Sequence, residues 1–171
     1  LATALNLVAL DPKLRIIELS RNFGHHKAMM TGLENASGEH VFLIDVDLEE
    51  SPELLGRFIN ELQQGQHDVV YGYQQERKGG WFERVSGAIA WRLINLLLPI
   101  RVPHNHSPVR LMTKTYTSSH VSHQERKTAL GGLWVMTGFR QQGLESVKVP
   151  RQQNSYQVDG RWDGATGSIL V

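Results

Sequence analysis

A short apolar stretch that ends in acidic residues constrains the fold of this chain more than any other feature. The segment HVFLIDVDLEE, residues 40–50, changes from apolar to acidic at Asp45, and Asp47 and Glu49 follow. Its apolar part has the length and composition of a buried strand. Because residues i and i+2 of a strand point the same way, Asp45 and Asp47 are predicted to lie together at the carboxyl end of that strand.

Predicted helices and strands alternate around this segment. In order they are a helix at 1–10, a strand at 14–20, a helix at 25–36, the strand at 41–44, a helix at 51–65 and a strand at 67–73. In the helix at 51–65, Ser51 is the expected N-cap, Pro52 the first helical residue and Gly65 the end. The alternation predicts an α/β fold of three layers around a mostly parallel sheet.

The pattern is looser after residue 73. The expected elements are a helix at 81–98, an irregular segment at 99–110, a short strand and helix within 111–125, a helix at 131–143 and a last strand at 144–150. No structure is assigned to the tail at 157–171.

The length, composition and net charge of the chain are those of one ordinary globular domain. The chain has 171 residues, of which 40% are hydrophobic and 20% charged, and its net charge of +1 does not suggest nucleic-acid binding. It has no cysteine, which excludes disulfides and a thiol nucleophile. No signal peptide is expected. The longest apolar run, residues 85–100, is interrupted by Arg92 and Asn95, and is typical of a packed helix or one lying on a membrane surface.

The acidic residues predict a metal site. Asp45 and Asp47 have no lysine or arginine beside them in the sequence, so the two carboxylates repel each other unless a cation lies between them. An oxygen-only pair suits Mg²⁺ or Mn²⁺, which takes further ligands from phosphates. We therefore expect a divalent cation holding a nucleotide diphosphate at this edge. The alternative is that the acids only begin a loop and help to cap the helix at Ser51.

Residues 19–55, LSRNFGHHKAMMTGLENASGEHVFLIDVDLEESPELL, resemble the core of family-2 glycosyltransferases, in the branch of dolichol-phosphate mannose synthase and bacterial polyprenyl-phosphate glycosyltransferases. DVVYG, RLM, GGLW and TGFRQ extend the likeness through about nine-tenths of the chain. The resemblance implies a nucleotide-sugar-binding fold of the GT-A type. Residues 1–156 would be an incomplete catalytic domain and 157–171 a tail, because the family's first strands, with their base- and ribose-binding motifs, are missing.

The resemblance also implies roles for individual residues. Asp45 would lie near the nucleoside or its phosphates, Asp47 would be the main metal ligand, and Glu49 would be a third acid near the metal. Arg77 and Lys78 fall in a loop that covers the active site in such proteins, where they would meet the diphosphate. A solvated surface position is the alternative for both.

One segment departs from the family pattern. Relatives often carry D-x-G-D-F-R-L with a catalytic carboxylate, whereas this chain has NHSPVRLM at 105–112. Arg110 fits the motif and would hold the acceptor phosphate or the leaving group, or else form a structural ion pair. Asn105 and Pro108 replace the acids, and neither can act as a base. A phosphate monoester, with a second pKa of about 6, needs no base, so the departure favours a polyprenyl-phosphate acceptor or else signals weakened activity.

Other candidates carry less weight. Glu125 is a reserve base or positioning residue by the resemblance, with a surface role as the alternative. A zinc site is disfavoured, although histidines are paired at 104 and 106 and at 120 and 123. His25 and His26 open a helix that faces the expected site, either as phosphate contacts or as a surface pair. The tryptophans are interpreted as core or interface residues.

These observations together predict an inverting, metal-dependent hexosyltransferase. It would move a sugar from a UDP- or GDP-sugar to a polyprenyl phosphate in the synthesis of cell-envelope polysaccharide or glycolipid. The longer protein would be anchored at the cytoplasmic face of the membrane, this fragment would be soluble, and a homo-oligomer is compatible with the sequence. The alternatives are a sugar-1-phosphate nucleotidyltransferase and a catalytically silent binding protein of the same fold.

Overall fold

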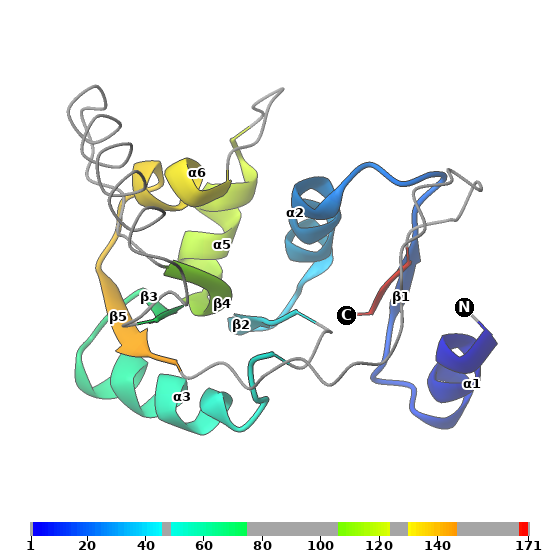
Figure 1. Cartoon of the computed structure of the whole chain (residues 1–171), viewed down its shortest axis with the longest axis horizontal. Coiled ribbons are helices and arrows are strands. Elements are labelled where there is room, and N and C mark those ends of the chain that lie inside the picture. The colour runs from blue at the N-terminus through cyan, green and yellow to red at the C-terminus, as the bar shows by residue number, and fades with distance from the viewer. Residues whose placement is uncertain (1, 46–48, 75–105, 124–129, 147–167, 171) are drawn as a thin grey trace, which may run out of the picture.

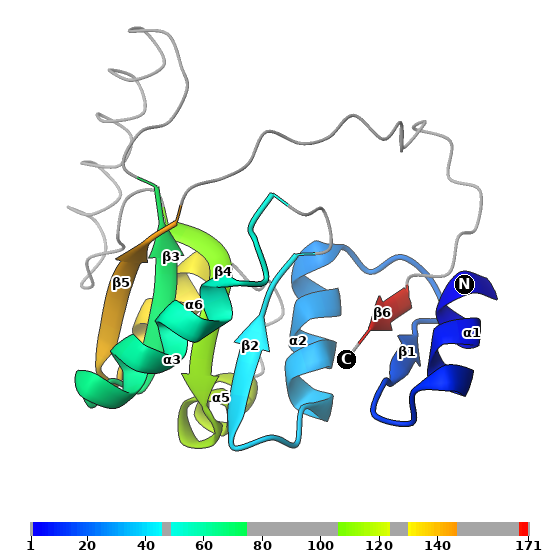
Figure 2. The same cartoon turned by 90° about the horizontal axis from the view of Figure 1, so that it is seen from below.

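A four-stranded sheet forms the centre of the molecule. The computed structural model describes residues 2–45, 49–74, 106–123, 130–146 and 168–170. The strands are β2 (His40–Leu43), β3 (Val69–Tyr73), β4 (His106–Thr113) and β5 (Gln141–Glu145), in the spatial order β2-β4-β3-β5. Figures 1 and 2 show helices above and below this sheet, which confirms the predicted three-layer α/β architecture.

Three of the four strands run in the same direction. β3 and β5 are parallel, while β4 lies antiparallel between β2 and β3. The parallel prediction therefore holds for β2, β3 and β5, and β4 is the exception. Between the pairs Tyr71–Arg110 and Tyr73–His106, two steps along β3 match four along β4, so β4 bulges there. Pro108 falls inside this irregularity, where its missing N–H costs no ladder hydrogen bond.

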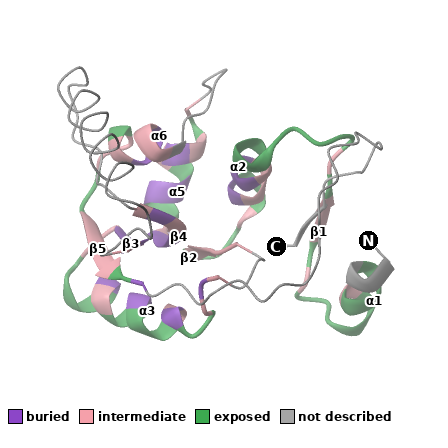
Figure 3. Ribbon diagram, in the orientation of Figure 1, coloured by how far each residue is buried: buried purple, intermediate pink, exposed green. Residues whose placement is uncertain are grey.

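Helix α3 (Leu54–Gln64) covers one face of the sheet. Its buried side chains pack on inward-facing residues of β3 and β4, and this core contains Leu54, Phe58, Leu62, Val70, Val109 and Leu111. The other face is covered by α2 (His25–Asn35), α5 (Lys114–Val121) and α6 (Leu130–Met136). Figure 3 shows buried residues on the helices of both layers and on the strands between them.

A smaller unit lies beyond α2. Helix α1 (Ala2–Leu10) leads into β1 (Ile16–Glu18), which pairs antiparallel with β6 (Ser168–Leu170). Figures 1 and 2 place this pair at the end of the molecule away from β5. The sequence patterns predicted α1 and β1, but assigned no structure to the tail that contains β6.

Three predictions about local structure are wrong. Residues 106–110, expected to belong to an irregular segment, are the first part of β4. The helix expected at 131–143 ends at Met136, and Gln141–Glu145 is a strand. The strand expected at 144–150 therefore begins earlier, at Gln141, and residues 147–150 lie outside the described part of the chain. Gly138 and Phe139 have φ values of 77° and 68°, a left-handed conformation that ends the helical path. In α3 the N-cap position is Glu53, without a side-chain cap, so Ser51 does not cap the helix.

No helix in the described part of the chain is long and apolar enough to cross a membrane. The helix predicted at 81–98 lies outside the described residues.

Candidate functional site

The carboxyl ends of β2, β3 and β5 meet the start of β4 at one edge of the sheet. Tyr73, the last residue of β3, pairs with His106, the first residue of β4. On the other side of β3, Tyr73 pairs with Glu145, the last residue of β5. β2 reaches the same edge, because Leu43 pairs with Arg110. Asp45 follows two residues later. Ligands of open α/β sheets bind at such an edge, so this is the candidate site.

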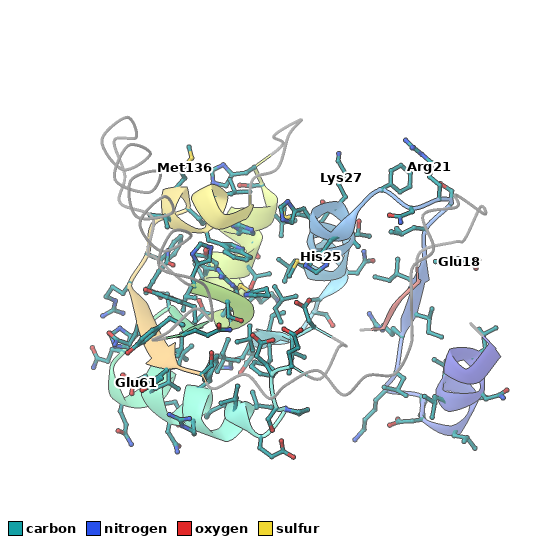
Figure 4. All side chains as sticks on the ribbon, viewed as in Figure 1. Glu18, Arg21, His25, Lys27, Glu61 and Met136 are labelled. Atoms are coloured by element: carbon teal, nitrogen blue, oxygen red, sulfur yellow. The ribbon has the colours of Figure 1, made fainter. Side chains whose placement is uncertain are left out.

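Asp45 lies beside the first residue of α2. The Nε2 atom of His25 is 3.7 Å from Oδ1 of Asp45, and the two side chains are 58% and 25% exposed. In Figure 4, Lys27 extends from α2 away from the sheet, whereas His25 lies at the side of the helix nearer to it. Gly24 precedes the helix at φ 88° and gives it no side-chain cap. The helix start and the acidic end of β2 therefore form one surface.

The carboxylates fit a hard divalent cation by donor type. Asp45 and Glu49 are described and half-buried on either side of residues 46–48, whereas Asp47 lies outside the described residues. Oxygen ligands of this kind are those that Mg²⁺ and Mn²⁺ take. Within the described ranges, no group of three acids or histidines is arranged to hold a metal ion. The metal prediction therefore stays a prediction.

Glu50 has a different position from its acidic neighbours. It is only 1% exposed and accepts a hydrogen bond from the hydroxyl of Ser107 in β4. This contact links the segment after β2 to the start of β4. The sequence did not distinguish Glu50 from the other acids, because its burial depends on a partner 57 residues away.

Arg110 is a buried cation in the centre of the sheet. It is 1% exposed, donates from Nε to the carbonyl of Pro108 at 3.1 Å and from Nη2 to that of Ser107 at 3.3 Å. Its guanidinium carbon lies 3.1 Å from the centre of the Trp134 ring. No carboxylate in the described part of the chain forms an ion pair with it. A structural ion pair is therefore not seen among these residues.

The surroundings of Arg110 lower its affinity for a proton without removing its charge at neutral pH. Burial lowers the pKa of Arg110 to about 9, and nearby Tyr116 and Tyr71 oppose that shift. Burial raises the pKa of Tyr71, the residue directly opposite Arg110 on β3. A cation held in such a place favours an anion as partner.

Behind this cation lies a polar network in the core. The hydroxyl of Tyr116 donates to the carbonyl of Trp134 at 2.9 Å, and the Thr137 hydroxyl donates to Leu133. His120 Nδ1 lies 3.0 Å from the Thr137 oxygen and must donate, because that hydroxyl is already used. Burial, then the charge of Arg110, lowers the pKa of His120 to about 4. His120 is thus a neutral core residue.

Two cavities adjoin Trp134. The larger, about 220 Å³, is lined by the start of α2, the start of β4 and α6, with His25, His26, Met29, His106, Pro108, Gly131 and Trp134 in its wall. The smaller, about 10 Å³, touches Arg110 and Tyr71 and shares His106, Gly131 and Trp134 with the larger. It holds about one water molecule at most.

The structure thus brings some of the predicted residues together. Asp45 and Glu49 follow the end of β2, and Arg110 lies further inside the sheet, opposite Leu43 and Tyr71. Asp47, Arg77, Lys78 and Glu125 lie outside the described residues. Trp134 is 6% exposed in the core, as expected. The sequence pattern connects His106 only with a possible zinc site. The histidine packs on Gly131, where a Cβ would lie 2.9 Å from its Nε2 atom, and the GG pair before Trp134 was the signal for this close approach.

Comparison with known proteins gives a consistent result. The family model described as glycosyl transferase family 2 matches residues 1–120. A protein of Mycobacterium tuberculosis named as a putative glycosyltransferase is 46% identical over 91% of this chain and 46% of its own length. An uncharacterised glycosyltransferase of Bacillus subtilis is 33% identical over 83% of this chain and 44% of its own.

A third relative has a more specific name. The undecaprenyl-phosphate 4-deoxy-4-formamido-L-arabinose transferase of Edwardsiella ictaluri is 34% identical over 69% of this chain and 35% of its own length. The chain spans less than half the length of each of these three relatives.

Proposed function

The chain belongs to glycosyl transferase family 2, and from that premise we propose that it moves a sugar from a nucleotide-sugar donor to a polyprenyl phosphate, with inversion at the anomeric carbon. The name of the Edwardsiella relative supports a lipid-phosphate acceptor. Because this chain spans about half the length of its relatives or less, the substrates of the whole protein belong to the proposal.

Arg110 is the observation that carries the choice of a phosphate acceptor. A buried arginine is costly unless partners satisfy its charge. Among the described residues, Arg110 donates to the carbonyls of Ser107 and Pro108 and contacts the hydroxyl of Tyr116, but it forms no ion pair with a carboxylate. Arg110 follows His106, the first residue of β4, by four positions, and His106 lies at the edge of the sheet near Asp45. The guanidinium supplies a fixed positive charge at low dielectric, which favours a phosphate brought to that edge.

The reaction needs no proton transfer. An oxygen of the acceptor phosphate attacks the anomeric carbon, the bond from that carbon to the donor diphosphate breaks, and the diphosphate leaves with the electron pair. By the resemblance to the family motif, Pro108 stands in the place of an acid, and it has no titratable group. A phosphate monoester is an anionic nucleophile at neutral pH, so the loss of the base is compatible with this acceptor and incompatible with efficient transfer to an alcohol.

The donor would be held at the acidic end of β2. Asp45, Asp47 and Glu49 are the proposed ligands of Mg²⁺ or Mn²⁺, and a bound cation there would offset the charge of the leaving diphosphate. Arg77 and Lys78 are proposed to contact the same diphosphate. Since the acceptor is a lipid, the protein is proposed to work at the cytoplasmic surface of the membrane.

Calorimetry with UDP- and GDP-sugars, with and without Mn²⁺, tests the donor half of the proposal. We expect binding of one nucleotide class that requires the metal and is abolished by Asp47→Ala. Glycosyl transfer to a polyprenyl phosphate then separates a transferase from a sugar-1-phosphate nucleotidyltransferase. Binding that ignores both the metal and Asp47→Ala would instead identify a catalytically silent protein of the same fold.

A further inference from the structure

The acidic segment between β2 and α3 contains one acid that is buried. Glu50 is 1% exposed, whereas Glu49 before it is half-buried and Glu53 after it is exposed. Removing a carboxylate from water is costly, so a buried one is retained where hydrogen bonds or charges compensate for the lost hydration. An acid that only began a loop would lie in solvent. The burial of Glu50 therefore indicates that this side chain maintains a contact inside the molecule.

Glu50 contacts Ser107, near the start of β4. The hydroxyl of Ser107, a residue that is 3% exposed, donates to Oε1 of Glu50 and accepts from the N–H of Val109 at 3.3 Å. Because the hydroxyl both donates and accepts, its rotation is fixed. The carbonyl of Ser107 accepts a further hydrogen bond from Nη2 of Arg110 at 3.3 Å. Ser107 thus connects the buried acid to the buried cation.

The strand β4 holds the acidic segment from both of its ends. Asp45 follows β2, and the pairing of β2 with β4 extends as far as Arg110. At the other end of the segment, Glu50 contacts β4 at Ser107, three residues before Arg110 in the sequence. The proposed metal ligands that the structure describes, Asp45 and Glu49, are therefore both close in the chain to a point held by β4.

A segment that is held in this way should bind a cation more tightly than a free one. Carboxylates that must be gathered around a metal lose conformational freedom and repel one another as they approach. Because consecutive Cα atoms are about 3.8 Å apart, a fixed Glu50 restricts where the carboxylate of Glu49 can lie. The hydrogen bond from Ser107 forms when the chain folds, so less freedom remains to be lost when the cation binds.

We propose that Glu50 is a positioning residue for the metal site. Through its hydrogen bond with Ser107, it holds the acidic segment in the arrangement that binds the divalent cation, without contacting the cation itself. This role rests on the proposed function, because it requires the metal site of the donor. The same hydrogen bonds lead through Ser107 to Arg110, so they also connect the donor side of the proposed site with the acceptor side.

Binding of Mn²⁺ alone, measured by the loss of the EPR signal of the free ion, tests this role. Glu50→Ala removes the hydrogen bond and is expected to weaken Mn²⁺ binding by about tenfold, as the loss of a group that supports metal ligands typically does. Ser107→Ala removes the same hydrogen bond from the other side and should have a similar effect. Glu50→Gln retains an oxygen that accepts from Ser107, so its affinity should stay within about twofold of the unmodified protein.

Further variants separate positioning from direct binding. Glu49→Gln removes a proposed ligand and should weaken Mn²⁺ binding much more than Glu50→Gln does. Glu53→Ala removes an exposed acid nearby and should leave binding unchanged. The double variant Glu50→Ala/Ser107→Ala should lose no more affinity than either single variant, because both substitutions remove one interaction. Thermal unfolding gives the folded fraction of each variant, and Ser107→Ala decides the test if Glu50→Ala does not fold.

The outcomes distinguish this role from the proposed function. Unchanged Mn²⁺ affinity in the alanine variants, or additive losses in the double variant, overturns the positioning role and leaves the proposed function intact. A loss in Glu50→Gln as large as that in Glu49→Gln identifies Glu50 as a ligand and also overturns it. If the unmodified protein binds no Mn²⁺, the metal site and the positioning role fail together. If the variants behave as expected but no sugar is transferred, the positioning role stands and the proposed function fails.

Discussion

The two faces of the central sheet differ in what they bury. The hydrophobic cluster under α3 consists of aliphatic and aromatic side chains around the fully buried Phe58, and the buried polar residues Glu50, Ser107 and Ser146 lie at the edge of the sheet. The face under α2, α5 and α6 buries Arg110, His120 and the indole N–H of Trp134 among its apolar residues. Polar burial of this kind costs stability, so we propose that one face maintains the fold and that the other serves the proposed reaction.

Phe58→Ala should have the largest effect on stability. Its ring meets Phe42 edge-on with centroids 5.9 Å apart, and it packs in a cluster of hydrophobic side chains. We expect the free energy of unfolding to fall by about 3–5 kcal/mol, measured by urea denaturation. Sugar transfer per folded molecule should be unchanged, and a large loss of it would show that the two faces are not separate in function.

Arg110→Met should affect sugar transfer strongly and stability little, the opposite of Phe58→Ala. Methionine fills similar space without a charge, so stability is expected to stay equal or rise, whereas sugar transfer should fall by about 100-fold or more. Arg110→Lys retains the charge but not the planar fork, and should give an intermediate rate. Strong destabilisation with normal turnover of the folded fraction would instead support a structural ion pair.

His120→Phe should remove part of the acid sensitivity. With a folded pKa of about 4 and an ordinary value of 6.5, the unfolded chain binds a proton between these pH values and the folded one does not. Stability of the unmodified protein should therefore fall by about 1–3 kcal/mol as pH drops from 6.5 to 4. Phenylalanine retains an aromatic ring that can stack on Tyr116. The free energy of unfolding, measured by denaturation at several pH values, should therefore change less with pH in the variant than in the unmodified protein. Equal slopes would contradict the burial argument.

The smallest effects concern helix starts on the two faces. Thr113 caps α5, because its side chain accepts a hydrogen bond from the Tyr116 N–H, whereas Ser51 lies before the N-cap of α3. Thr113→Ala should cost about 1 kcal/mol and Ser51→Ala less than about 0.5 kcal/mol in thermal unfolding. A larger cost at Ser51 would restore the predicted cap.

Regular parts of the fold could be predicted because their signals are local. The spacing of Met29, Met30 and Leu33 fixes the buried face of α2, and the apolar run 41–44 marks β2. The strand at Gln141–Glu145 could not be predicted, since QQGLE lacks the usual strand pattern and forms by pairing with β3. Pro108 concealed β4 for a similar reason, because a bulge makes it acceptable there.

Residues of the candidate site could be predicted only where they belong to one short sequence motif. Asp45 and Arg110 could be singled out from short segments, whereas the partnership of Trp134 with Arg110 and of Glu50 with Ser107 joins residues 24 and 57 positions apart. Such contacts depend on tertiary packing, which no local pattern encodes. The roles of Asp47, Arg77, Lys78 and Glu125 stay predictions, because these residues lie outside the described part of the structure.

The central claim is that the polar face of the sheet exists to receive a lipid phosphate. The most direct measurement is transfer of a radiolabelled sugar, from the nucleotide donor that calorimetry identifies, to a polyprenyl phosphate and to the matching polyprenol. The account predicts labelled lipid with the phosphate alone, and about 100-fold less of it with Arg110→Met. Equal transfer to the polyprenol, or full activity in Arg110→Met, would contradict it.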